Sequence, residues 1–253
     1  MTEDATGIAV RQWGELAPGA VLLDGFHAIK HALRFGARVG PVLTTDAAAV
    51  LALADGLADD VTDALRGLLT EVDRDVLRGL VPRGHTTEVA ALAARPARED
   101  NLAALARRPR PAPVVLLDNP RNLGNVGAVV RLAAGFGATG VVTTGDLDPW
   151  HQNAVRAGAG LHYATAVERV KTDILPPGPL FALDPEGEDV RTVVLPDDAV
   201  LAFGSERHGI SDEVRARADR LVSLPMRPQV SSYNLATSVG MTLFHWGGPK
   251  AAG

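Results

Sequence analysis

"PVVLLDNPRNLGNVGAVVRLAAGFGATG", from Pro113 to Gly140, is the stretch that decides the fold. The run "PVVLLD" (113–118) is short and mostly apolar, which is typical of a strand buried on both faces of a sheet. "NVGAVVRLAAGFGA" (125–138) has a helical character and closes on glycines, and "GVVTT" (140–144) follows as the next strand. A strand, a helix and a strand in this order predict two parallel strands joined by a crossover helix.

The same alternation continues downstream. Further strands are expected at "LFALD" (180–184), "AVLAF" (199–203) and "LVSLP" (221–225), and helices at "HQNAVRAGAG" (151–160), "SDEVRARAD" (211–219) and "NLATSVGMTLFHW" (234–246). Continuous apolar strands separated by helices predict an α/β fold with a parallel sheet covered on both faces. Ligands of such sheets bind at the carboxyl ends of the strands, so the polar residues after each strand matter most.

The rest of the chain suggests a second domain. Helices and short strands alternate from residue 1 to 97 and predict a small α/β domain, and the proline-rich stretch 98–112 reads as a linker to a domain over 113–253. The net charge of −5 gives no electrostatic argument for nucleic acid, and the absence of cysteine excludes disulfides and thiolate zinc sites. No signal peptide or membrane-length apolar run is seen, so a cytoplasmic protein without a membrane partner is expected.

Three loops after expected strand ends carry the polar residues. In the first loop Asn125 could cap the helix, and Arg131 is a charge in an apolar helix that either serves a function or reaches solvent. In the second, "GSERHGIS", Gly204 lets a ligand approach the backbone closely, and Ser211 caps the next helix. In the third, Ser231, Ser232 and Asn234 either cap a helix or donate hydrogen bonds to a ligand. No G-x-G-x-x-G or P-loop is present, which argues against dinucleotide and nucleoside triphosphate sites.

Taken in order, these loops resemble the three motifs of the SpoU/TrmH family of RNA ribose 2′-O-methyltransferases. The matching segments are "DNPRNLGNVGAVVRLAAGFGATG", "FGSERHGIS" and "LPMRPQVSSYNLATSVG", within residues 113–246. The resemblance implies S-adenosylmethionine as cofactor, a C-terminal sheet domain with a deep trefoil knot, and a homodimer with its active site at the subunit interface. "LLDGFHAIKHALRFGARV" further resembles the family's ribosomal-protein-like RNA-binding domain.

The resemblance also assigns residues to roles. The expected catalytic residues are Arg131, Asn125, Glu206, Ser232 and Asn234, with Glu206 holding either the arginine or the first loop. The expected cofactor-binding residues are Phe203, Gly204, Ser205, Gly209, Leu224, Met226, Ser232, Tyr233 and Asn234. The expected substrate-binding residues are Arg121, Arg156, His27 and Arg34. Tyr233 stands where the family usually has leucine. No metal is expected, because His27 and His31 have the spacing of a metal pair but no evident third ligand.

The predicted substrate is structured RNA, with ribosomal RNA preferred over transfer RNA. Two alternatives stay open. One is a transfer RNA 2′-O-methyltransferase, and the other is a non-catalytic RNA-binding protein on the same scaffold. The presence of Arg131, Asn125 and the Ser232–Asn234 pair favours the enzyme.

Overall fold

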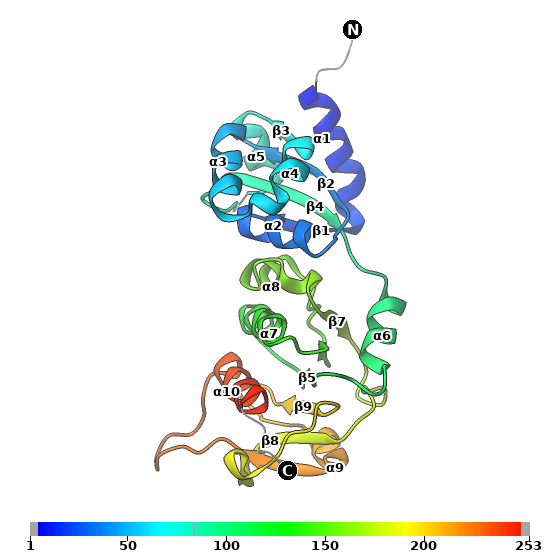
Figure 1. Ribbon diagram of the computed structural model, residues 1–253, viewed down its shortest axis with the longest axis vertical. Coiled ribbons are helices and arrows are strands. Elements are labelled where there is room, and N and C mark those ends of the chain that lie inside the picture. The colour runs from blue at the N-terminus through cyan, green and yellow to red at the C-terminus, as the bar shows by residue number, and fades with distance from the viewer. Residues whose placement is uncertain (1–4, 83, 249–253) are drawn as a thin grey trace. The chain divides into compact units, whose positions relative to one another are not determined.

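The computed structural model describes residues 5–82 and 84–248, which form two compact units (Figure 1). One unit consists of the chain up to Pro96 together with Trp150–Ala164. The other consists of Ala97–Pro149 and the chain from Thr165 onward. Among the helices of the described residues, none has the length and apolar character that a membrane span requires.

The second unit is built on a parallel sheet with the strand order β10-β8-β9-β5-β6-β7. Every neighbouring pair in this sheet is parallel, which confirms the predicted α/β class and parallel core. The strands are β5 (Val114–Leu117), β6 (Gly140–Thr143), β7 (Ala166–Arg169), β8 (Leu180–Asp189), β9 (Val200–Phe203) and β10 (Arg220–Ser223). The helices are α6 (Arg98–Ala106), α7 (Leu123–Phe136), α9 (Asp212–Arg217) and α10 (Leu235–Gly247), with a 3-10 helix η4 (Val190–Thr192).

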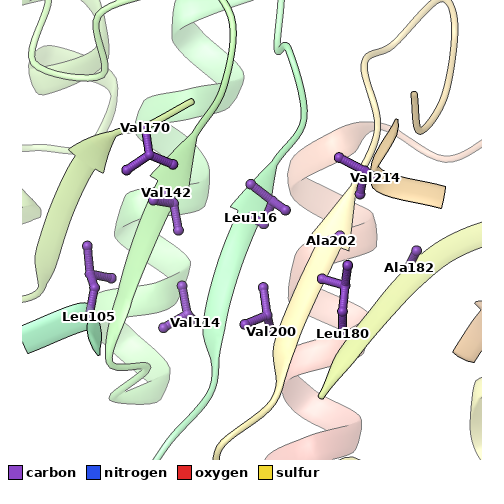
Figure 2. Packing of buried hydrophobic residues seen from close by; sticks show 10 residues of the cluster. All are labelled: Leu105, Val114, Leu116, Val142, Val170, Leu180, Ala182, Val200, Ala202 and Val214. Atoms are coloured by element: carbon purple, nitrogen blue, oxygen red, sulfur yellow. The ribbon is translucent and has the colours of Figure 1, made fainter. Parts of the chain in front are cut away.

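The core of this unit lies against the central strands of the sheet. Strands β5, β6 and β9 are buried at every position, as a sheet covered on both faces requires. Figure 2 shows one apolar cluster, in which side chains of neighbouring strands meet residues of α6 and α9. Its members are Leu105, Val114, Leu116, Val142, Val170, Leu180, Ala182, Val200, Ala202 and Val214.

Helix α7 begins earlier than the sequence pattern indicated. Its N-cap is Asn122, whose side-chain Oδ1 accepts a hydrogen bond from the Asn125 backbone N–H at 3.1 Å. The prediction that Asn125 could cap this helix is therefore wrong, and the Asn125 side chain is released for other contacts. The helix ends at Gly137, which takes a left-handed conformation with φ 70°.

The first unit contains a mixed four-stranded sheet in the order β1-β4-β2-β3. Strand β4 is antiparallel to both β1 and β2, and β3 is parallel to β2. The strands are β1 (Ala20–Asp24), β2 (Val39–Thr44), β3 (Leu69–Glu71) and β4 (Val89–Ala94). The helices are α1 (Ala5–Leu16), α2 (Phe26–Arg34), α3 (Ala47–Leu57), α4 (Thr62–Leu68), α5 (Arg74–Leu80) and α8 (Gln152–Ala157), with the 3-10 helices η1 (Ala17–Gly19), η2 (Asp59–Val61) and η3 (Leu161–Tyr163).

Helix α8 was expected in the domain over 113–253, but Trp150–Ala164 forms part of the first unit. Arg156 of α8 pairs with Asp24 of β1 at 3.0 Å. A Cβ added to Gly160, which has φ 73°, would lie 2.4 Å from the Ala28 carbonyl oxygen. Glycine at this position therefore permits both the left-handed turn and the close approach of two backbones.

The expected linker is largely ordered. Helix α6 occupies its first part, and Arg110 lies in its second part. Arg110 is buried and donates hydrogen bonds to backbone carbonyl oxygens in three segments of the second unit. Burial lowers the pKa of this guanidinium.

Candidate functional site

Two of the three loops are fixed to each other by the buried carboxylate of Asp118. Strands β5 and β9 are neighbours, with Leu117 opposite Phe203, so their loops leave the sheet side by side. One oxygen of Asp118 accepts a hydrogen bond from the Thr144 hydroxyl at 2.8 Å, and the other accepts one from the Ser211 backbone N–H at 2.7 Å. The carboxylate of Asp118, a residue that is 4 % exposed, therefore ties the start of the first loop to the end of the second.

The second loop is a tight return that begins at Gly204. Ser205 and Gly209 exchange two backbone hydrogen bonds of 2.9 and 3.0 Å, and Gly209 has φ 67°. A Cβ added to Gly204 would lie 1.9 Å from the Gly209 carbonyl carbon and 2.1 Å from the Ile210 nitrogen. The backbone that approaches Gly204 closely is therefore the loop's own, and a side chain at this position would push the loop apart.

Side chains of the three loops meet in one hydrogen-bonded network. The Asn125 Nδ2 donates to Glu206 Oε1 at 2.8 Å, and the Asn234 Nδ2 donates to Asn125 Oδ1 at 3.1 Å. The second oxygen of Glu206 accepts from the Arg121 backbone N–H at 3.2 Å. Glu206 therefore holds the first loop, which is one of the two roles expected for it.

The third loop is closed by its own residues. Asn234 caps α10, since its Oδ1 accepts from the backbone N–H groups of Ala236 at 2.9 Å and Thr237 at 3.4 Å. The Tyr233 hydroxyl donates to the Pro225 carbonyl oxygen at 3.0 Å and so joins the two ends of the loop. The capping interpretation is confirmed for Asn234 and also for Ser211, which caps α9.

A cavity of about 380 Å³ is lined by the middle of β8, the segments that follow β9 and β10, and the start of α10. All nine residues expected to bind the cofactor line it, together with Glu206. Ser231, expected as a donor of the third loop, also lines it, and so do residues that the sequence did not point to: Leu183, Asp184, Pro185, Leu235 and Ser238. Asp184 ends the expected strand "LFALD", so the rule that ligands bind at strand ends could have found it.

Asn125, Arg121 and Arg131 lie outside the residues that line the cavity. Arg131 is exposed on α7, and its guanidinium forms no ion pair or hydrogen bond with any residue that the structure describes. Its charge is therefore free to meet a negatively charged group from outside the described chain.

The other expected substrate-binding residues belong to the first unit. Arg156 pairs with Asp24, and Arg34 donates two hydrogen bonds, of 2.7 and 2.5 Å, to Asp60. This pairing raises the pKa of Arg34 and lowers the pKa of the Asp60 carboxyl. The exposed His27 ring lies 6.5 Å from the His31 ring. Within residues 5–82 and 84–248, no group of three histidine, aspartate or glutamate side chains is placed to hold a metal ion.

Comparisons with known proteins cover the part of the chain that carries the three loops. A family model described as the SpoU rRNA Methylase family matches residues 112–244. The chain is 32 % identical, over 55 % of its length and 59 % of the relative, to the 23S rRNA (adenosine(1067)-2'-O)-methyltransferase of Streptomyces azureus. It is 32 % identical, over 52 % of its length and 62 % of the relative, to an uncharacterized tRNA/rRNA methyltransferase of Archaeoglobus fulgidus. The chain thus spans less than two thirds of these relatives.

Among solved structures, the fold is similar to that of the SpoU methyltransferase AviRb from Streptomyces viridochromogenes in complex with the cofactor AdoMet. The TM-score is 0.74 at 24 % identity, and the match covers 94 % of this chain and 96 % of that one. An AdoMet-bound rRNA methyltransferase from Sinorhizobium meliloti gives a TM-score of 0.73 at 23 % identity, with 97 % and 96 % covered. At this level of identity the likeness shows that the fold is shared.

Proposed function

Because the chain belongs to the SpoU rRNA Methylase family, we propose that it is an S-adenosylmethionine-dependent methyltransferase that modifies the 2′-hydroxyl of a ribose in structured RNA. The observation that carries the proposal is the network of Asn125, Glu206 and Asn234, which joins the three loops beside the cavity. Relatives named as 23S rRNA 2′-O-methyltransferases favour ribosomal RNA as the substrate. Transfer RNA is the second candidate, because other relatives are named only as tRNA/rRNA methyltransferases.

The cavity fits the proposed cofactor. Its volume falls within the range of about 300–1,000 Å³ that is usual for small-molecule sites. Phe203, Leu224 and Met226 give it an apolar lining suited to an adenine ring, and the Ser232 hydroxyl is among its polar groups. S-adenosylmethionine would supply a methyl group already activated on a cationic sulfonium. The protein's task is then to align a ribose hydroxyl with that methyl group.

The hydroxyl must lose a proton as it attacks. Arg131 cannot accept that proton under ordinary conditions, since a guanidinium keeps its own protons very tightly. We assign to Arg131 the stabilisation of the developing alkoxide, with an RNA phosphate oxygen as the first acceptor of the proton. Its guanidinium is exposed and has no partner among the residues that the structure describes, which suits this role. Asn125 and Glu206 position the first loop and hence the start of α7, which carries Arg131.

The proposal also covers the rest of the architecture. We infer a deep trefoil knot in the second unit from the family to which the chain belongs. The segment that would form the knot runs from the edge strand β10 through the third loop to α10, which packs on α7. We infer that the first unit binds RNA, as a ribosomal-protein-like domain would. Ribosomal RNA as substrate would place the enzyme in the cytoplasm.

A homodimer completes the proposal. Phe244 on α10 is 72 % exposed and Val194 is 81 % exposed, the two highest values among large hydrophobic side chains in the described part of the chain. The His245 Nε2 lies 2.9 Å from the Val193 carbonyl oxygen. Phe244 and Val194, which adjoin these two residues in the sequence, therefore belong to one area of the surface. An apolar area of this kind is typical of an interface.

Replacing Phe244 with aspartate should therefore weaken the dimer at least about tenfold, because a charge would be buried without a partner. Sedimentation equilibrium of the wild type and the variant measures the effect. The matched control is Leu57→Asp, at a 53 % exposed leucine of α3, which should leave the dimer unchanged. A wild-type protein that stays monomeric at micromolar concentration contradicts the dimer.

The activity itself is tested with S-adenosylmethionine labelled in its methyl group and either total ribosomal RNA or total transfer RNA. We expect label in ribosomal RNA, at a linkage that resists alkaline hydrolysis because the 2′-hydroxyl is blocked. Label in transfer RNA alone would favour the second candidate. Cofactor binding without label in either RNA would favour a non-catalytic RNA-binding protein.

A further inference from the structure

Asp184 lies where strand β8 departs from regular pairing. In the neighbouring strand β10, Leu221 pairs with Ala182 of β8, but the next residue, Val222, pairs with Glu188 of β8. Residues 183–187 therefore bulge out of the sheet at its carboxyl edge, as an irregularity of this kind allows. The bulge places Asp184 in the wall of the cavity between the second and third loops, and the Asp184 side chain is 10 % exposed.

The carboxylate of Asp184 is held by two contacts on one side. Its Oδ1 accepts a hydrogen bond from the Glu186 backbone N–H at 2.9 Å, and its Oδ2 pairs with the Arg215 guanidinium of α9. The other arm of Arg215 pairs with Glu186 at 2.7 Å. Each carboxylate oxygen can accept about two hydrogen bonds, so each keeps one acceptor position for a ligand.

The charge balance indicates what kind of donor this carboxylate takes. Arg215 offsets the negative charge of Asp184, so the pair attracts a cationic group less than a lone carboxylate would. Its neighbours in the cavity wall, Leu183 and Pro185, are apolar. A fixed acceptor in such a wall suits neutral hydroxyl donors, and a vicinal diol matches its two oxygens. Dinucleotide-binding folds use an acidic side chain in this way to bind a ribose.

We propose that Asp184 binds the ribose hydroxyls of the adenosyl cofactor and makes the cavity selective for a ribose over a deoxyribose. The inference rests on the proposed function. It gives Arg215 a positioning role, since its ion pair fixes the direction of the carboxylate.

The test compares two ligands on three proteins by isothermal titration calorimetry. The ligands are S-adenosylhomocysteine and its 2′-deoxy form, and the proteins are the wild type, Asp184→Asn and Glu186→Gln. For the wild type we expect the deoxy ligand to bind about 10- to 100-fold more weakly, as loss of a hydrogen bond to a charged group predicts. For Asp184→Asn we expect weaker binding of the full ligand and less than about a threefold difference between the two ligands.

Glu186→Gln is the matched control, because Glu186 shares Arg215 but is 79 % exposed and does not line the cavity. It should keep the wild-type difference between the two ligands. A wild type that binds both ligands equally, or an Asp184→Asn variant that keeps the full difference, overturns the assignment of Asp184. A folded wild type that binds neither ligand overturns the proposed function as well. The deoxy ligand tests the wild type directly, so this result does not depend on the folding of any variant.

Discussion

Replacing Arg131 with lysine is expected to lower the rate of methyl transfer about 100- to 1,000-fold, the effect of removing one donor to a developing oxyanion. The affinity for S-adenosylmethionine should change less than about twofold, because Arg131 does not line the cavity. Lysine keeps the positive charge but loses the planar fork that can contact an alkoxide and a neighbouring phosphate together. Single-turnover kinetics on ribosomal RNA and calorimetric titration of the cofactor measure the two quantities separately.

The matched control for Arg131 is Arg220→Lys. Arg220 is an exposed arginine of the same unit, but it donates to Glu188 at 2.7 Å and lies on the edge strand β10. It should keep the wild-type rate. An Arg131→Lys enzyme with full turnover would refute the assigned role, and a loss of cofactor affinity equal to the loss of rate would indicate a structural defect.

The parallel sheet was predictable because its strands are buried on both faces and read as continuous apolar runs. Strands β5 and β9, with four buried residues each, carry this signal in its clearest form. The N-cap of α7 was not predictable in the same way. Asn122 and Asn125 are both suited to capping, and only the residue at which the extended backbone passes into the helix, Asn122, decides between them.

The residues that line the cavity were predictable in the three loops but not in β8. Asp184 contacts Arg215, 31 residues away along the chain, and no local pattern encodes an ion pair at that separation. The same holds for Trp150–Ala164. The pattern of this segment predicts a helix, and α8 confirms it, but the pattern does not say which sheet the helix joins. That choice depends on tertiary contacts such as the pair of Arg156 with Asp24.

The largest expected effect on stability belongs to Arg110. Its guanidinium joins three segments of the second unit, since it donates to the carbonyl oxygens of Leu105 at 3.3 Å, Pro177 at 2.5 Å and Asp198. Arg110 is 3 % exposed, so water cannot replace these bonds when the side chain is removed. Each buried carbonyl left without a donor costs about 1–3 kcal/mol.

We therefore expect Arg110→Met to lower the free energy of unfolding by about 2–4 kcal/mol, since methionine fills part of the space but donates nothing. The midpoint of thermal unfolding should fall by about 5–15 °C. Arg108→Met provides the control, because Arg108 pairs with Asp198 at 3.1 Å but its side chain is 55 % exposed. Such an exposed pair contributes only about 0–1 kcal/mol. Thermal unfolding of both variants is monitored by circular dichroism. Equal unfolding midpoints for the two variants would mean that Arg110 does not hold the three segments together.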